Sequence, residues 1–198
     1  MHYFLDFDRT IFDTESFKRA FAERPPIRVV FRQFFEAARE FFSPTRSLSK
    51  RRIFMRSFGT YVSHGRFNFL PNELKEYLYP DAVTFLSAHG TETTIVTYGV
   101  RAFITAKVAN ALTDLPLNDV VYTHRKKGRT IRRLCRGYEG PFAFIDDAHF
   151  QLESVSRTCP DVQVIEIRRD NRAGSGRWPV IHSFDELSNV TANPFPQS

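Results

Sequence analysis

The second half of the chain alternates short apolar runs with segments of helical periodicity, and this alternation restricts the possible folds more than any other feature. The short runs are rich in β-branched and aromatic residues, which is typical of buried strands. Strands are predicted at 94–98, 119–123, 142–145 and 162–167, and helices through 103–112 and at about 128–136 and 149–157. The alternation predicts an α/β fold whose parallel sheet is covered by helices on both faces.

The N-terminal part departs from this alternation after a first predicted strand, His2-Tyr3-Phe4-Leu5. Breaks at Pro, Gly and Ser divide the next 75 or so residues into helices. These helices are predicted at about 15–23, 27–42, 47–58, 71–79 and 81–89, with Asp13 or Thr14 as the cap of the first and Asp81 as the cap of the last. The sequence therefore predicts one α/β core, residues 1–14 and 80–198, with a helical unit of residues 15–79 inserted into it. Residues 171–179 are predicted to form a flexible loop.

The composition is that of a folded globular chain, since 42% of the 198 residues are hydrophobic and 25% are charged. No apolar stretch approaches the roughly 20 residues of a membrane helix, and Cys135 and Cys159 are too few for a disulfide framework. We therefore expect free thiols, a cytoplasmic location and no membrane partner. The net charge of +6 favours anionic ligands, either phosphates or nucleic acid, although a solvated basic surface also accounts for it.

Two carboxylates, Asp6 and Asp8, follow the first predicted strand directly. Side chains two positions apart share one face of a strand, so two like charges would lie close together if the extended geometry continued. Such a pair needs a cation or a shared proton to offset the repulsion. The stretch therefore indicates a divalent metal site or a pair of a nucleophile and an acid, although aspartates are also common in turns after strands.

Polar residues also end the later predicted strands. Ligands bind beyond the carboxyl ends of the strands in open α/β sheets. Thr97 ends the second strand, Lys127 lies in the segment Arg125-Lys126-Lys127-Gly128, and Asp146 and Asp147 end a later strand. Together with the D-x-D-x-T motif of residues 6–10, this order resembles the haloacid dehalogenase-like hydrolase superfamily, over residues 3–12 and 93–168. The resemblance implies a three-layer, Rossmann-like parallel core with an α-helical cap inserted after the first motif.

The resemblance also implies catalytic roles. Asp6 would be the nucleophile that forms an aspartyl phosphate, and Asp8 would be the general acid and base. Thr97 would hydrogen-bond the phosphoryl oxygens, and Lys127 would neutralise charge on the nucleophile and the phosphate. The dehalogenase branch lacks the second aspartate, so Asp8 favours phosphoryl chemistry.

A metal site and a substrate site are implied in the same way. Mg²⁺ would be held by Asp6, the backbone carbonyl of Asp8 and Asp146, with Asp147 acting next to the metal or through water. The residues expected to contact the substrate are Thr10, Tyr98, Gly99 and Arg101.

Several assignments have alternatives. Lys126 could replace Lys127, although Lys127 is better placed to lead into an amphipathic helix. Lys107 lies in the middle of a predicted helix, and we expect it on a solvated face. Arg101 could be a surface residue, and His64 and His124 could be as well. In the predicted cap, His64, Arg66, Arg24 and Arg28 are candidates for contacts that select the substrate.

The sequence thus predicts a Mg²⁺-dependent phosphohydrolase that acts on a small phosphomonoester. The alternatives are a phosphotransferase or a phosphatase of nucleic-acid ends in the same superfamily, and a non-catalytic binding protein with the same fold. The sequence predicts neither the substrate nor the oligomeric state.

Overall fold

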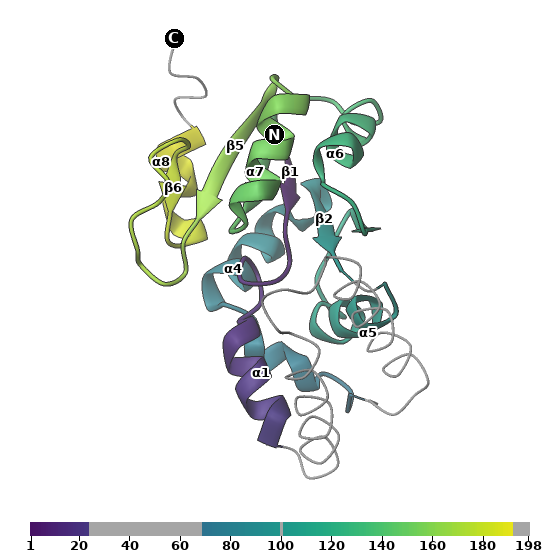
Figure 1. The fold of residues 1–198 in the computed structure, drawn as a ribbon. Helices are drawn as coiled ribbons and strands as arrows, with labels where there is room; N and C mark the ends of the chain where they lie inside the picture. The colour runs from purple at the N-terminus through teal and green to yellow at the C-terminus, as the bar shows by residue number, and fades with distance from the viewer. Residues whose placement is uncertain (24–68, 100, 192–198) are drawn as a thin grey trace, which may run out of the picture.

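The computed structural model describes residues 1–23, 69–99 and 101–191 (Figure 1). The strands are β1 (His2–Leu5), β2 (Thr93–Tyr98), β3 (Asp119–Thr123), β4 (Phe142–Asp146), β5 (Val162–Ile167) and β6 (Val180–Ile181). The α-helices are α1 (Thr14–Glu23), α4 (Pro80–His89), α5 (Arg101–Ala111), α6 (Gly128–Leu134), α7 (His149–Thr158) and α8 (Leu187–Thr191). Short 3₁₀ helices are η2 (Glu73–Tyr77), η3 (Gly90–Glu92) and η4 (Phe184–Glu186). No helix in these ranges is long and apolar enough to cross a membrane.

The strands form one six-stranded sheet in the order β3-β2-β1-β4-β5-β6, and every pair of neighbours is parallel. The central strands β1, β4 and β5 are buried along nearly their whole length, which explains why their sequences are apolar without alternation. The predicted α/β fold with a parallel sheet is confirmed. The first strand of the chain lies in the middle of this sheet, so the residues that come after it have neighbours from both sides.

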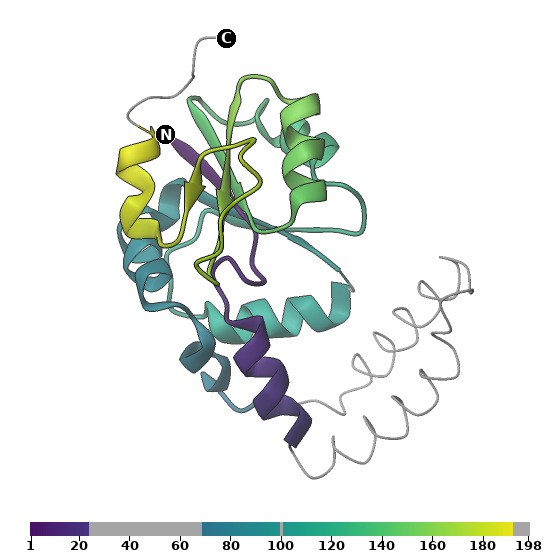
Figure 2. The same ribbon diagram turned by 60° about the vertical axis from the view of Figure 1, so that its left-hand side comes forward.

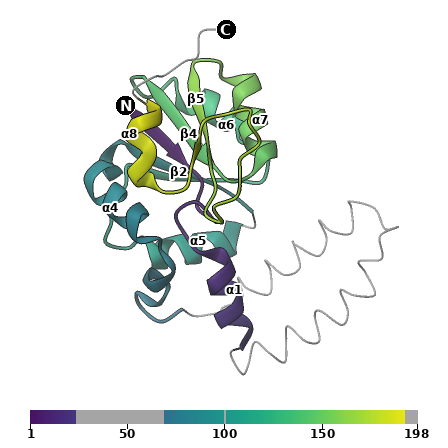
Figure 3. The same cartoon turned by 90° about the vertical axis from the view of Figure 1, so that its left-hand side faces the viewer.

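Helices cover both faces of the sheet (Figures 2 and 3). On one face, α4, α5 and α8 pack against the apolar side chains of Leu5, Ile95 and Ile145. On the other face, α6 and α7 pack against Phe4 and Phe144, and Figure 3 shows these two helices on the side of the sheet opposite to α4 and α8. Adjacent residues of β1 therefore enter different cores, as expected for side chains that alternate along a strand.

The structure differs from the predicted elements at the C-terminal end. The loop predicted at 171–179 is followed by β6, η4 and α8, which the sequence patterns do not predict. β6 has only two residues, Val180 and Ile181, so it carries no periodic signal. Asp81 does not cap α4, because the helix has no side-chain cap and Asp81 instead accepts a hydrogen bond from the backbone N–H of Phe184 at 2.7 Å.

Two of the predicted N-terminal helices lie outside the described residues. The helices at 27–42 and 47–58, and the residues His64, Arg66, Arg24 and Arg28, belong to that part of the chain. The helix predicted at 15–23 is present as α1, and the one at 71–79 is the shorter 3₁₀ helix η2. The division into a core and a cap of residues 15–79 stays a prediction.

Arg169 anchors the loop that comes after β1. Its guanidinium donates two hydrogen bonds to the backbone carbonyl of Thr10, at 2.7 and 3.0 Å, and a third to Asp81 at 2.6 Å. The side chain is 9% exposed and lies over the ring of Tyr79 at 4.2 Å. These contacts tie the strand β5 region, helix α4 and the loop of Asp6 to Thr10 together.

Replacing Arg169 by Met is expected to lower the free energy of unfolding by about 3 kcal/mol, because it leaves the carboxylate of Asp81 buried without its partner. Urea unfolding measures this change. Arg172→Met is the matched control, since the side chain of Arg172 is 83% exposed. A loss no larger than that of the control would contradict the anchoring role.

Candidate active site

The register of the sheet places Asp6 beside Asp146. Leu5 pairs with Ile145 between β1 and β4, Asp6 directly follows β1, and Asp146 is the last residue of β4. The backbone N–H of Asp6 donates to the carbonyl of Ile145 at 2.9 Å, which continues the pairing by one residue. Asp6 is 7% exposed and Asp146 is fully buried. Two carboxylates from distant parts of the sequence thus share one low-dielectric site, where their repulsion needs compensation.

Lys127 lies between these two carboxylates. Its Nζ donates to Oδ2 of Asp146 at 2.6 Å and also to Oδ1 of Asp6. The residue precedes α6, and its backbone N–H donates to the side chain of Gln151 at 2.9 Å, so the start of the helix is held against α7. Burial acts to lower the pKa of Lys127, but the charges of Asp146 and Asp6 raise it above its ordinary value. Lys126 is exposed, so the structure brings Lys127 to the carboxylates.

Three carboxylates gather at this point, from Asp6, Asp146 and Asp147. One oxygen atom of each lies within 4.8 Å of those of the other two. Burial raises the pKa of Asp6 to about 7 and that of Asp147 to about 6, because a charged carboxylate is poorly solvated there. The ammonium of Lys127 offsets part of this negative charge, and Arg9 forms an ion pair with Asp147 at 3.8 Å at the partly exposed side of the cluster. A set of oxygen ligands with excess negative charge fits a hard divalent cation such as Mg²⁺.

Asp8 lies in a different environment from Asp6. Its Oδ1 accepts a hydrogen bond from the hydroxyl of Thr14 at 2.5 Å and forms an ion pair with Lys107. The side chain of Asp8 is 33% exposed, and its carboxylate does not contribute to the acidic cluster. The backbone conformation of the turn allows this, because Arg9 adopts a positive φ of 60° and turns the chain directly after Asp8.

The prediction that Lys107 lies on a solvated face is wrong, since the residue is 1% exposed. A signal for its burial was present in the sequence. Lys107 follows Ile104 by three positions and precedes Ala111 by four, and both of these residues are in the core. The periodicity of α5 thus places Lys107 on the buried face. The role of Thr14 was also missed: Asp13 caps α1 by accepting from the backbone N–H of Ser16 at 3.0 Å, and this leaves the hydroxyl of Thr14 for Asp8.

Thr97 and Thr10 carry buried hydroxyl groups. Thr97 is 1% exposed and Thr10 is fully buried, and neither Oγ1 has a hydrogen-bond partner among the described residues. Buried hydroxyl groups nearly always have a partner, so an unpaired one at the end of β2 indicates a place where a ligand oxygen could bind.

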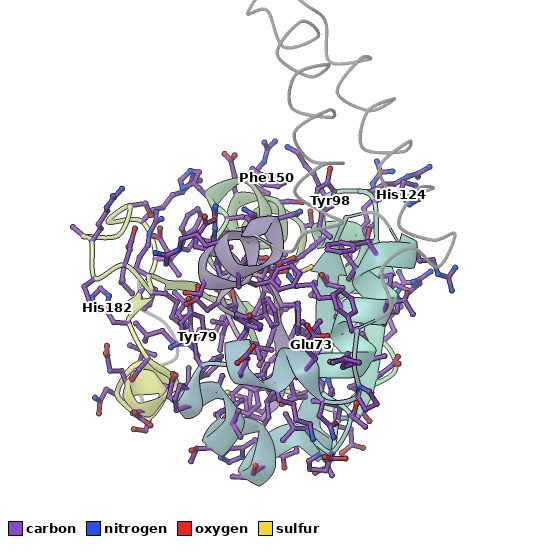
Figure 4. The ribbon with its side chains drawn as sticks, turned by 90° about the horizontal axis from the view of Figure 1, so that it is seen from below. Glu73, Tyr79, Tyr98, His124, Phe150 and His182 are labelled. Atoms are coloured by element: carbon purple, nitrogen blue, oxygen red, sulfur yellow. The ribbon has the colours of Figure 1, made fainter. Side chains whose placement is uncertain are left out.

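The other residues predicted to contact the substrate surround the end of β2. Gly99 has a φ of 152°, and its N–H donates to the carbonyl of Thr123 at 3.1 Å, so this amide is already paired. Arg101 is exposed at the start of α5. Tyr98 is 47% exposed, and its ring lies 6.1 Å from that of Phe150. The two rings meet edge to face, at an interplanar angle of 79°, and Figure 4 labels both residues together with His124, which directly follows β3.

Comparison with solved structures supports the fold. A haloacid dehalogenase-like hydrolase from Burkholderia xenovorans has a TM-score of 0.61 at 14% identity, with 97% of this chain and 98% of that one covered. HAD-hydrolase YfnB from Bacillus subtilis, solved with magnesium bound, has a TM-score of 0.58 at 12% identity, with coverage of 95% and 96%. The L-2-haloacid dehalogenase from Xanthobacter autotrophicus has a TM-score of 0.54 at 15% identity, with coverage of 97% and 98%.

The comparison with curated proteins gives no match to this chain. The sequence profile of the haloacid dehalogenase-like hydrolases, in contrast, matches residues 3–154. That match spans β1 to α7 and includes all of the carboxylates and lysines described above. On the extent of this match, the chain belongs to the haloacid dehalogenase-like hydrolase family.

Proposed function

We propose that this protein is a Mg²⁺-dependent phosphohydrolase that acts on a small phosphomonoester through an aspartyl phosphate on Asp6. The observation that carries this proposal is that Asp6 and Asp8, two positions apart in the sequence, lie in different surroundings and pair with different lysines. Asp6 is buried within the acidic cluster and paired with Lys127, which suits a nucleophile whose charge is held in place. Asp8 is partly exposed and has its own partners, Thr14 and Lys107, which suits a group that exchanges protons.

The solved relatives include dehalogenases, so haloacid hydrolysis is the competing activity within the family. The dehalogenase from Xanthobacter autotrophicus was solved with chloropropionic acid covalently bound. A carbon–halogen bond releases halide, which needs no proton from the enzyme, whereas an alkoxide leaving group does. A second aspartate two positions after the nucleophile therefore supports phosphomonoester chemistry.

The reaction would proceed in two steps at Asp6. The carboxylate attacks phosphorus, the bond from phosphorus to the leaving oxygen breaks, and Asp8 donates a proton to that oxygen. Asp8 then accepts a proton from water, which attacks the aspartyl phosphate and restores the carboxylate of Asp6 with release of phosphate. Lys127 would hold the nucleophile in position and neutralise the phosphoryl group. Mg²⁺ held by Asp6, Asp146 and Asp147 would supply a fixed positive charge next to the phosphoryl oxygens.

The unpaired hydroxyl of Thr97 supports a phosphoryl site at the same end of the sheet. A phosphoryl oxygen is an acceptor, so it would provide the partner that this buried donor lacks among the described residues. Mg²⁺ binding and a small phosphorylated substrate remain parts of this proposal.

The direct test is an assay of the purified full chain on a panel of sugar phosphates, nucleoside monophosphates and p-nitrophenyl phosphate. We expect phosphate release that requires Mg²⁺, that EDTA abolishes, and that excess Mg²⁺ restores. L-2-chloropropionate is assayed in parallel for chloride release. Chloride release without phosphate release would replace the proposal by a dehalogenase function, and release of neither product by a folded protein would also contradict it.

A further inference from the structure

Lys107 is a charged residue that lies inside the apolar core. Its side chain is 2% exposed, inside a core built from the apolar residues of α5 and the loop after β1. An ammonium group in such a place must be desolvated, and this cost is offset by its ion pair with Asp8 and by the aromatic rings around it. A methionine would fit this core without a charge. The reason for a lysine at this position is therefore to be found in the groups that its ammonium contacts.

The ammonium is held on several sides by aromatic rings. Nζ lies 4.0 Å from the ring centroid of Phe12, 5.1 Å from that of Phe17 and 5.2 Å from that of Phe7. Desolvated contacts of this kind stabilise a cation and restrict its movement. Phe7 and Phe12 belong to the same loop as Asp8, so this loop supplies both the carboxylate and two of the three rings around the ammonium.

Both donors to Asp8 reach the same oxygen. Thr14 donates its hydroxyl hydrogen to Oδ1, and Lys107 donates to Oδ1 as well. Oδ2 receives no hydrogen bond from any side chain in the part of the chain that the structure describes. One oxygen of the carboxylate is thus anchored from two directions, and the other remains for a substrate or water.

The two buried lysines serve different carboxylates. Lys127 contacts Asp6 and Asp146, and Lys107 contacts Asp8. They come from different elements, one preceding α6 and the other in the middle of α5. The nucleophile and the proton donor therefore have independent supports, and removal of one lysine leaves the contacts of the other intact.

We propose that Lys107 is a positioning residue that, together with Thr14, holds Oδ1 of Asp8 so that Oδ2 delivers the proton to the leaving oxygen. This inference rests on the proposed phosphohydrolase function. In the step concerned, the bond between phosphorus and the leaving oxygen breaks as its electron pair takes the proton of Asp8, and the alcohol departs neutral. The carboxylate that results keeps its ion pair with Lys107.

The test compares two esters of nearly the same shape, phenyl phosphate and p-nitrophenyl phosphate. Nitrophenolate leaves readily without a proton, whereas phenolate depends more on the acid. In Lys107→Met, we expect kcat/KM for phenyl phosphate to fall about 100-fold and that for p-nitrophenyl phosphate only about tenfold, since a positioned acid contributes on the order of 10²–10⁴-fold. The ratio of the two values, p-nitrophenyl phosphate over phenyl phosphate, should therefore rise about tenfold, and a general structural defect would not change it.

Lys75→Met is the matched control. Lys75 lies on the helix η2 and forms an ion pair with Asp114, away from Asp8, so this substitution should leave the ratio unchanged. Thr14→Val removes the other donor to Oδ1 and should raise the ratio in the same direction by a smaller factor. Urea unfolding of Lys107→Met should show a smaller loss of stability than that of Lys127→Met, because Asp8 loses its ion pair but is 33% exposed and keeps the hydrogen bond from Thr14.

Equal losses for both esters in folded Lys107→Met would overturn the inference while leaving the phosphohydrolase proposal intact. If Lys107→Met does not fold, Thr14→Val decides in the same way, and an unchanged ratio there overturns the inference. Failure of the wild type to release phosphate from either ester would instead overturn the proposed function, and the role of Lys107 with it.

Discussion

Asp6→Asn is expected to lower kcat for phosphate release by about 10⁴-fold or more, because an amide oxygen is a poor nucleophile and no other carboxylate among the described residues occupies its place. The substitution keeps the size of the side chain. It also removes one negative charge from a site in which burial raises the pKa of Asp6 to about 7. The folded state should therefore be as stable as the wild type or more stable, so that lost activity reports chemistry and not unfolding.

Steady-state phosphate release and urea unfolding measure these two effects. Acid quenching during turnover, followed by mass spectrometry, should find phosphate on the peptide that contains Asp6 in the wild type and none in the variant. Asp161→Asn is the matched control, since Asp161 is exposed at the opposite end of the sheet, before β5. Activity of Asp6→Asn within tenfold of the wild type would show that another group is the nucleophile.

Lys127→Met should lower both activity and stability. Loss of the ammonium leaves Asp6 and Asp146 buried side by side without a positive charge, and we expect the free energy of unfolding to fall by about 3 kcal/mol. Because the same ammonium would neutralise the phosphoryl group, kcat should fall by about 10²–10³-fold. Bound Mg²⁺ would replace part of the missing charge, so the stability loss should shrink as the Mg²⁺ concentration rises.

Lys126→Met is the control that distinguishes the roles of the two neighbouring lysines. Lys126 is exposed, so this variant should retain wild-type activity and stability. Unfolding is followed with and without Mg²⁺ for both variants, and phosphate release is measured under the same conditions. A larger activity loss in Lys126→Met than in Lys127→Met would mean that the catalytic lysine is misassigned. A stability loss in Lys127→Met that Mg²⁺ does not change would contradict a metal site at the acidic cluster.

Lys107 departs from a general rule about charged residues in helices. A charged residue in the middle of a helix is usually solvated, whereas the helical spacing from Ile104 to Ala111 puts Lys107 on the buried face of α5. The partner that makes burial possible, Asp8, is 99 positions away and meets Lys107 at the edge of the core, in the loop that follows the central strand β1. Asp81 shows the same effect: a local rule predicts a helix cap, but the tertiary fold gives this carboxylate to Arg169.

The sequence by itself determined the strands and helices of the α/β series, because apolar runs and helical periodicity are local properties of the chain. It also determined which residues end each strand, and therefore which carboxylates, lysines and hydroxyl groups could meet. Only the tertiary structure decided which lysine pairs with which carboxylate: Lys127 pairs with Asp6 and Asp146, and Lys107 pairs with Asp8. The physical reason is that the fold joins Lys107 to Asp8 and Lys127 to Asp6 across 99 and 121 positions of the chain, and contacts at such separations leave no local pattern.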